Sequence, residues 1–150
     1  MHPAPETTLR AAGLKVTKGR AAALAVLQQH PHSTADQLHE RLSLVGAAMT
    51  LQAVYLSLQV LTDRGVLRRI EPAGGPARYE VRVDDDHHHL VCTACSAVVD
   101  VDCASGEAPC LHPVETHGFS VATAEITFWG VCPDCAARAA ARPPREEGAA

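Results

Sequence analysis

Apolar residues in the first half of the chain recur every three or four positions, which is the period of an amphipathic α-helix. Three such stretches begin after residues whose side-chain oxygen can cap a helix, namely Thr17, Ser33 and Thr50. The first stretch runs to about His30 and the third to Gly65, and a shorter helix is expected near 6–12. The chain before Gly65 is therefore predicted to be helical.

After Gly65 the period of the apolar positions changes to two. Residues 66–71 are apolar and basic, residues 79–83 alternate apolar with polar, and a turn with two consecutive glycines lies between them. This pattern predicts a β-hairpin. Three helices followed by a hairpin is the order of a winged helix-turn-helix, a DNA-binding motif.

The second half of the chain has shorter predicted elements. Strands are expected at 88–92, 98–101 and 119–131, with a helix at about 106–117. Three adjacent aspartates at 84–86 resist burial and are expected to form a hinge. The fold class is therefore predicted as α+β, with domains at 1–83 and 87–142 and a disordered tail at 143–150.

Charge divides the chain at the same place. Residues 1–82 carry 10 basic and 6 acidic side chains, a net of +4, whereas residues 83–150 carry 3 and 11, a net of −8. A polyanion is thus expected to meet the first half only. No apolar run reaches the roughly 18 residues of a membrane span, and the first residues lack the apolar core of a signal peptide. We therefore expect a cytoplasmic protein.

Two Cys-x2-Cys pairs in the second half are strong candidates for metal ligands. Four thiolates satisfy the tetrahedral preference of Zn(II), at about 2.3 Å each, with no position left for water. Only 3% of the residues are aromatic, so metal binding would supply folding free energy that a small core lacks. The sequence predicts a structural zinc site formed by Cys92, Cys95, Cys132 and Cys135.

Other interpretations of the cysteines stay open. A redox-active pair as in thioredoxin-like proteins is one, although neither pair lies at the start of a βαβ helix. Cys103 and Cys110 lie outside the pattern and could be free thiols, a disulfide pair or a secondary redox sensor. We favour plain free thiols for these two.

The third predicted helix has an exposed face that suits an AT-rich DNA site. Glutamine can bind adenine through two hydrogen bonds, and an apolar side chain can touch a thymine methyl group. Basic residues from the first helices and the hairpin can contact phosphates. The candidate DNA contacts are Lys15, Lys18, Arg20, Gln52, Tyr55, Gln59 and Arg68. A winged helix that makes only protein contacts is the alternative, and Leu56 is an unexpected apolar residue on this face.

Three consecutive histidines precede the first cysteine pair. Alternate residues of an extended segment share one side, so His87 and His89 should point together and His88 away from them. Two imidazoles on one side make half of a metal site. The alternative is a polar surface strand.

Six blocks of the sequence resemble, in order, the signature blocks of the ferric uptake regulator (Fur) family. They are LKVTKGRAAAL, HSTADQLHERL, AVYLSLQVLTDRGVLRRI, ARYE, HHHLVCTAC and WGVCPDC, within residues 9–136. The closest likeness is to the peroxide-sensing branch, the actinobacterial-type regulators of catalase genes. The resemblance implies a homodimeric, metal-dependent transcriptional repressor that binds double-stranded DNA. Its winged helix would precede a small α/β dimerisation domain that contains the four-cysteine zinc site. Nothing in the sequence suggests an enzyme.

The resemblance also implies a regulatory metal site formed by His32, Glu80, His87, His89 and Asp100. Three nitrogen and two oxygen ligands suit Fe(II) or Mn(II). Bound metal would fix the orientation of the two winged helices of a dimer on successive major grooves, and metal loss would lower DNA affinity.

The signal is less directly indicated. Peroxide-sensing relatives have Asp at the position of Asp100, whereas Glu80 is the residue of iron sensors. We favour a response to peroxide through bound Fe(II), with oxidation of His32 or His87, in control of oxidative-stress or iron genes. An iron- or other metal-responsive repressor of metal uptake is the alternative. A thiol-disulfide redox protein and a zinc-stabilised protein-interaction module are more distant ones.

Some members of the family have an additional metal site. Asp86, His88 and Glu107 occupy matching positions here, but the fourth ligand would fall near Ala124, which cannot coordinate a metal. This site is expected to be weak or absent.

Overall fold

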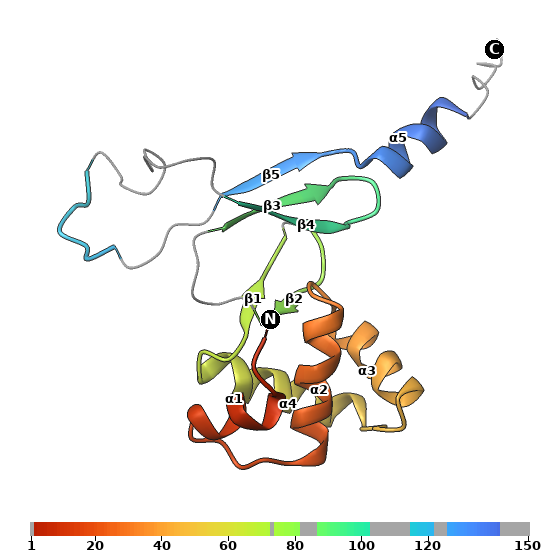
Figure 1. The fold of residues 1–150 in the computed structure, drawn as a ribbon. Helices are drawn as coiled ribbons and strands as arrows, with labels where there is room; N and C mark the ends of the chain where they lie inside the picture. The colour runs from red at the N-terminus through yellow and green to blue at the C-terminus, as the bar shows by residue number, and fades with distance from the viewer. Residues whose placement is uncertain (1, 73, 82–86, 103–114, 122–125, 142–150) are drawn as a thin grey trace, which may run out of the picture. The chain divides into compact units, whose positions relative to one another are not determined.

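The computed structural model divides into two compact units, Met1–Asp85 and Asp86–Ala150 (Figure 1). Each unit has its own elements and is described by itself. The residues that the structure describes are 2–72, 74–81, 87–102, 115–121 and 126–141.

The first unit consists of helices followed by a small antiparallel sheet. The helices are α1 (Pro5–Ala11), α2 (Lys18–Gln29), α3 (Ala35–Leu44) and α4 (Leu51–Asp63). The sheet consists of β1 (Arg68–Ile70) and β2 (Arg78–Glu80), so the hairpin is shorter than predicted. This is the predicted order of a winged helix-turn-helix.

Side-chain caps start α2, α3 and α4 of the first unit, with one difference from prediction. Thr17 and Thr50 each accept a hydrogen bond from a backbone N–H three residues later, as predicted. The third cap is Thr34, which forms a capping box with Gln37, and not Ser33. The backbone of Ser33 instead forms a β-bridge with Tyr79, which leaves the next residue to start α3.

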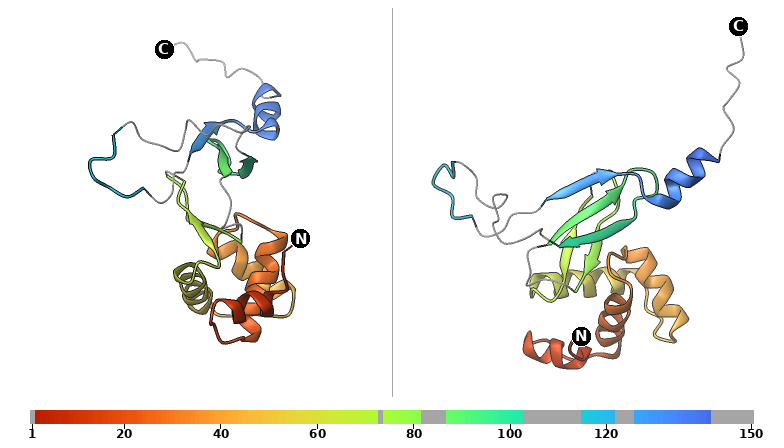
Figure 2. Two further views of the ribbon diagram at one scale, coloured as in Figure 1. Left: turned by 60° about the vertical axis from the view of Figure 1, so that its left-hand side comes forward. Right: turned by 45° about the horizontal axis from the view of Figure 1, so that its top comes forward.

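An apolar core packs all four helices against the hairpin, and both views in Figure 2 show the helices gathered into one bundle. Fully burying an aliphatic side chain is worth about 1.5–3 kcal/mol, so a core of this size can hold the unit together by itself. Its members include Leu9, Leu24, Leu27, Leu38, Leu42, Val54, Leu58, Leu61, Leu67 and Tyr79.

The second unit is a three-stranded sheet followed by a helix. The central strand β3 (His87–Cys92) pairs antiparallel with β4 (Val98–Asp102) and parallel with β5 (Thr127–Gly130). The helix α5 (Pro133–Ala140) follows β5, as the right-hand view of Figure 2 shows. Helices and strands in separate parts of the chain confirm the α+β fold class. None of the described helices is long and apolar enough to cross a membrane.

Two predicted elements of the second half require correction, and other predictions fall outside the described residues. The strand predicted over 119–131 is confined among the described residues to β5, which pairs with the second part of β3. Of the helix predicted over 106–117, the described end at 115–117 is not helical. Outside the described residues lie the predicted hinge, the predicted tail, Asp86, Cys103, Glu107, Cys110 and Ala124.

Candidate metal centres and nucleic-acid interface

The two predicted cysteine pairs lie together in the second unit. Cys92 ends β3 and Cys95 lies in the turn to β4, while Cys132 and Cys135 stand at the start of α5. The four Sγ atoms all lie within 4.8 Å of one another, and those of Cys95 and Cys132 are 3.8 Å apart. Sulfurs about 2.3 Å from a central ion stand about 3.8 Å apart at the corners of a tetrahedron. The cluster therefore fits Zn(II).

The pKa values of the Cys92 and Cys135 thiols are shifted in opposite directions. Backbone N–H groups, first that of Cys132 at 3.3 Å, lower the pKa of the Cys92 thiol to about 6. Hydrogen bonding to the sulfurs of Cys132 and Cys95, together with burial, raises the pKa of the Cys135 thiol to about 12. Arg138 donates a hydrogen bond to Cys135 Sγ at 3.2 Å but brings a single positive charge. A divalent cation at the centre of the cluster would offset the charge of four thiolates.

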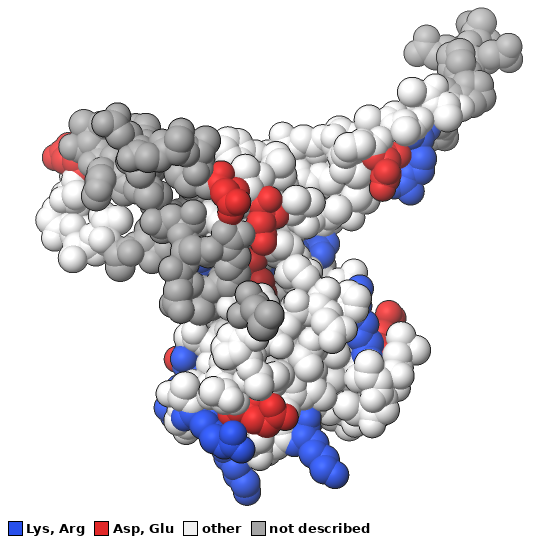
Figure 3. Space-filling model, in the orientation of Figure 1, with Lys and Arg blue, Asp and Glu red and all other residues white. Residues whose placement is uncertain are grey.

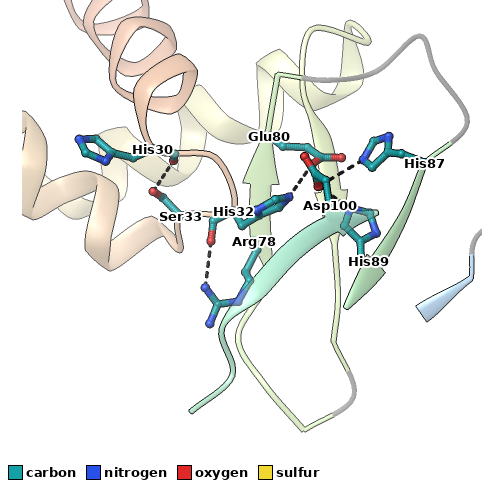
Figure 4. A network of polar contacts seen from close by, with 8 residues as sticks. All are labelled: His30, His32, Ser33, Arg78, Glu80, His87, His89 and Asp100. Carbon is teal, nitrogen blue, oxygen red and sulfur yellow. Dashed lines mark hydrogen bonds and ion pairs between the residues drawn. The ribbon is translucent and has the colours of Figure 1, made fainter. Parts of the chain in front are cut away.

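A histidine and a carboxylate form a buried pair in the first unit. His32 precedes α3 and Glu80 ends β2, and His32 Nε2 lies 2.8 Å from Glu80 Oε2 (Figure 4). His32 has a φ of +57°, in the left-handed region that few residues other than glycine adopt. The turn with this unusual backbone presents an imidazole nitrogen, and the end of β2 presents a carboxylate beside it.

The second unit carries two histidines and a carboxylate on one side of its sheet. The ring centroids of His87 and His89 are 4.8 Å apart, and their Nε2 atoms lie 3.7 and 3.6 Å from Oδ1 of Asp100 (Figure 4). Asp100 is there because it stands opposite His89 in the β3–β4 register. The ring of His88 instead lies 6.1 Å from that of Phe128. The predicted alternation of the three histidines is confirmed.

The structure brings the predicted regulatory ligands together as one pair and one group of three. Each lies within one unit, and each combines imidazole nitrogen with carboxylate oxygen, a donor set that suits Fe(II) or Mn(II). Of the three candidates for the additional site, only His88 lies among the described residues.

The helix α4 exposes the predicted base contacts. Gln52, Tyr55 and Gln59 are exposed, on the side away from the buried Val54 and Leu58. The helix contains no Lys or Arg, so it cannot form the paired hydrogen bonds with guanine that those side chains make. Its exposed face offers glutamine, tyrosine and apolar side chains, with the carboxylate of Asp63 at the end of the helix.

Basic side chains for phosphate contacts come from other elements of the first unit. Lys15 and Lys18 are exposed, Arg20 is half-buried and donates to the Lys15 carbonyl at 3.2 Å, and Arg68 is half-buried on β1. Figure 3 shows several Lys and Arg side chains projecting from this unit. The predicted cations are thus available, although Arg20 is partly engaged.

Two arginines at these sites were not predicted. Arg138 contacts Cys135 from three residues further along α5, a spacing that places both on one side of a helix. Arg78 is buried and donates to the backbone of His32 at 2.9 Å. The helical spacing could have indicated Arg138, whereas no local pattern indicates a contact as distant in sequence as that of Arg78.

A winged helix and a separate sheet unit, both with clusters of metal-ligand type, define a class of metal-binding protein with a DNA-binding fold. The comparisons identify the family within it. The model of the ferric uptake regulator family matches residues 11–129. The "Transcriptional regulator FurA" of Mycobacterium tuberculosis is 46% identical over 127 residues, 85% of this chain and 86% of that one. The "Ferric uptake regulation protein" of Escherichia coli K12 is 33% identical over 128 residues, 84% of this chain and 86% of that one.

A solved structure agrees with this assignment. The ferric uptake regulator from Pseudomonas aeruginosa with manganese is 27% identical, with a TM-score of 0.71 over 87% of this chain and 99% of that one. The chain belongs to the ferric uptake regulator family. It is a metal-dependent transcriptional regulator and not an enzyme, as predicted, and regulators of this family bind DNA and are generally dimeric.

Proposed function

We propose that the chain is an iron-responsive repressor, which binds its operator when a divalent metal ion occupies the regulatory ligands. The observation that carries the proposal is the arrangement of those ligands as His32 with Glu80 in the first unit and His87 and His89 with Asp100 in the second. The names of the relatives support iron over the peroxide response favoured from the sequence.

The two groups of ligands are proposed to share one ion. His32 and Glu80 alone offer too few donors for Fe(II) or Mn(II), and the three donors of the second unit also leave open positions. The ion supplies positive charge that offsets the two carboxylates. Ligands from residues 1–83 and 87–142 would then hold the DNA-binding unit in a fixed orientation to the dimerisation unit. Metal loss releases that constraint and lowers DNA affinity.

The cysteine cluster is proposed to hold structural zinc. Cys92 is the last residue of β3, the strand that carries His87 and His89 at its start. Thiolate ligation at Cys92 therefore fixes one end of the strand that presents two regulatory ligands. Since four sulfurs complete a tetrahedron, no position remains for a substrate or a signal molecule.

The operator is proposed to be an AT-rich palindrome of double-stranded DNA. Gln52 and Gln59 can pair with adenine, and Tyr55 can contact a thymine methyl group. Lys15, Lys18, Arg20 and Arg68 would contact phosphates and set affinity without reading sequence. Two copies of α4 in a symmetric dimer require two half-sites related by a two-fold axis.

The test first selects a DNA duplex that the full chain binds from a randomised pool. Fluorescence anisotropy then measures the affinity of the chain for that duplex. Saturating Mn(II) should tighten binding at least tenfold over chelated protein. His89→Ala should abolish this gain, whereas His88→Ala, on the same strand but the opposite face, should keep it. Equal binding with and without metal would overturn the proposal, as would a full gain in His89→Ala.

A peroxide response through bound Fe(II) is the second candidate, and the shorter carboxylate of Asp100 favours it. Oxygen transfer from peroxide to the ring of His32 or His87 would release water and destroy a ligand. Micromolar peroxide should then release the Fe(II)-loaded protein from DNA and add the mass of one oxygen to either peptide, leaving the Mn(II)-loaded protein bound. Equal release of both forms, or no added oxygen, would exclude it.

A further inference from the structure

Three consecutive residues of β2 hold the turn that carries His32. Arg78 Nη1 donates to the His32 carbonyl at 2.9 Å, and Glu80 Oε2 lies 2.8 Å from His32 Nε2. Between them, the Tyr79 N–H donates to the Ser33 carbonyl at 3.1 Å. The turn is thus attached to β2 through a backbone carbonyl, a backbone bridge and the imidazole itself. Figure 4 shows the first and the last of these contacts.

The backbone of His32 needs such support. Its φ of +57° is unfavourable for a residue with a Cβ, and the conformations nearby would point both the carbonyl and the imidazole elsewhere. The carbonyl accepts a hydrogen bond from the guanidinium of Arg78, a residue that is only 8% exposed. A charged donor with this little water access makes a strong hydrogen bond to a neutral acceptor.

The second arginine at this turn has a different contact. Arg41 Nη1 donates to Ser33 Oγ at 3.3 Å, and Ser33 Oγ donates to the His30 carbonyl at 2.7 Å. These bonds support the turn through a side chain beside His32. Arg41 is therefore a natural control for Arg78, since it lies at the same turn without holding the His32 carbonyl.

We propose that Arg78 is a positioning residue of the regulatory metal site. Its hydrogen bond holds His32 in the left-handed conformation, so that the imidazole faces Glu80 before any metal ion binds. The inference rests on the proposed function, because it assigns His32 and Glu80 to the metal. It adds a residue that ligates nothing yet sets the affinity of the site.

The strand β2, which contains Arg78, also belongs to the β1–β2 hairpin that forms the wing. In the antiparallel pairing of β2 with β1, Arg78 stands opposite Ile70 and Glu80 opposite Arg68. The residues that hold His32 are therefore paired with the strand that carries a proposed phosphate contact. Loss of the Arg78 hydrogen bond should raise the metal concentration needed for DNA binding, and saturating metal should restore that binding.

The experiment compares Arg78→Met, Arg78→Lys, Arg78→Gln and Arg41→Met in the full, zinc-loaded chain. Calorimetric titration gives the Mn(II) affinity, and long-range ¹H–¹⁵N spectra of the metal-free protein give the tautomer and shifts of the His32 ring. Outer-shell partners of metal ligands typically account for roughly 10–100-fold in affinity. Arg78→Met should lose affinity in that range and shift the His32 ring signals. Arg78→Lys, which keeps a charged donor, should recover most of both.

Arg41→Met should leave the affinity and the ring signals near those of the parent protein. An unchanged affinity in Arg78→Met, or an equal loss in Arg41→Met, would overturn the inference. If Arg78→Met does not fold, the comparison of Arg78→Lys with Arg78→Gln tests the inference. The His32 ring signals of Arg78→Lys must then stay closer to those of the parent protein than the signals of Arg78→Gln do. A parent protein that binds DNA equally well without metal would refute the proposed function, while the His32 spectra still report on positioning.

Discussion

Replacing Cys132 with Ser should unfold the second unit and leave the first unit folded. Among the described residues of the second unit, only Val91 and Cys92 are buried apolar side chains, and α5 has none. Burial of Val91 is worth about 1.5–3 kcal/mol, and Cys92 is itself a proposed zinc ligand. A structural zinc site contributes on the order of 10 kcal/mol, so its loss exceeds what the described core can offset. The first unit keeps its own core.

Hydrogen exchange followed by mass spectrometry, with zinc measured on the same sample, resolves the two units. In Cys132→Ser the zinc content should fall well below one per chain, and amides of β3 and β4 should lose protection. Amides of α2 and α4 should keep theirs. Cys103→Ser is the matched control, because that cysteine lies outside both pairs. One tightly held zinc in Cys132→Ser, with parental protection in β3, would refute this reasoning.

Two further predictions concern the first unit. Replacing thymine by uracil at a base that α4 contacts should weaken DNA binding up to about fourfold per methyl group, because each buried carbon is worth roughly 0.8 kcal/mol. Leu56 is 57% exposed on that face and should make part of the methyl contact, so Leu56→Ala should be less sensitive to the replacement. Burial, opposed in part by Arg69, raises the pKa of Tyr79 above 10.0. The unfolded chain then ionises first, so the free energy of unfolding should fall as pH rises above about 10 in urea titrations, and Tyr79→Phe should remove that fall.

The elements with local signals could be predicted from the sequence. The helices α2 and α4 have a capping threonine and an apolar period that need no distant partner. The cysteine pairs and the alternation of His87 and His89 likewise depend on spacing alone.

Features that depend on distant contacts could not be predicted. Thr34 caps α3 because Ser33 pairs with Tyr79, far away in sequence. The two-residue period of the hairpin puts Arg78 and Glu80 on a polar face, yet both are buried against other elements of the fold. A charged side chain is buried when a partner is available, and the turn at His32 provides one partner for each of the two.

The central claim, that both units bind the same regulatory ion, is tested most directly by Mn(II) stoichiometry. Calorimetric titration of the zinc-loaded chain should show one tight Mn(II) per chain. His32→Ala in the first unit and His89→Ala in the second should each weaken that single binding event at least tenfold. If either variant still bound one Mn(II) with the affinity of the parent protein, the account would be contradicted, because one group of ligands would then bind the ion without the other.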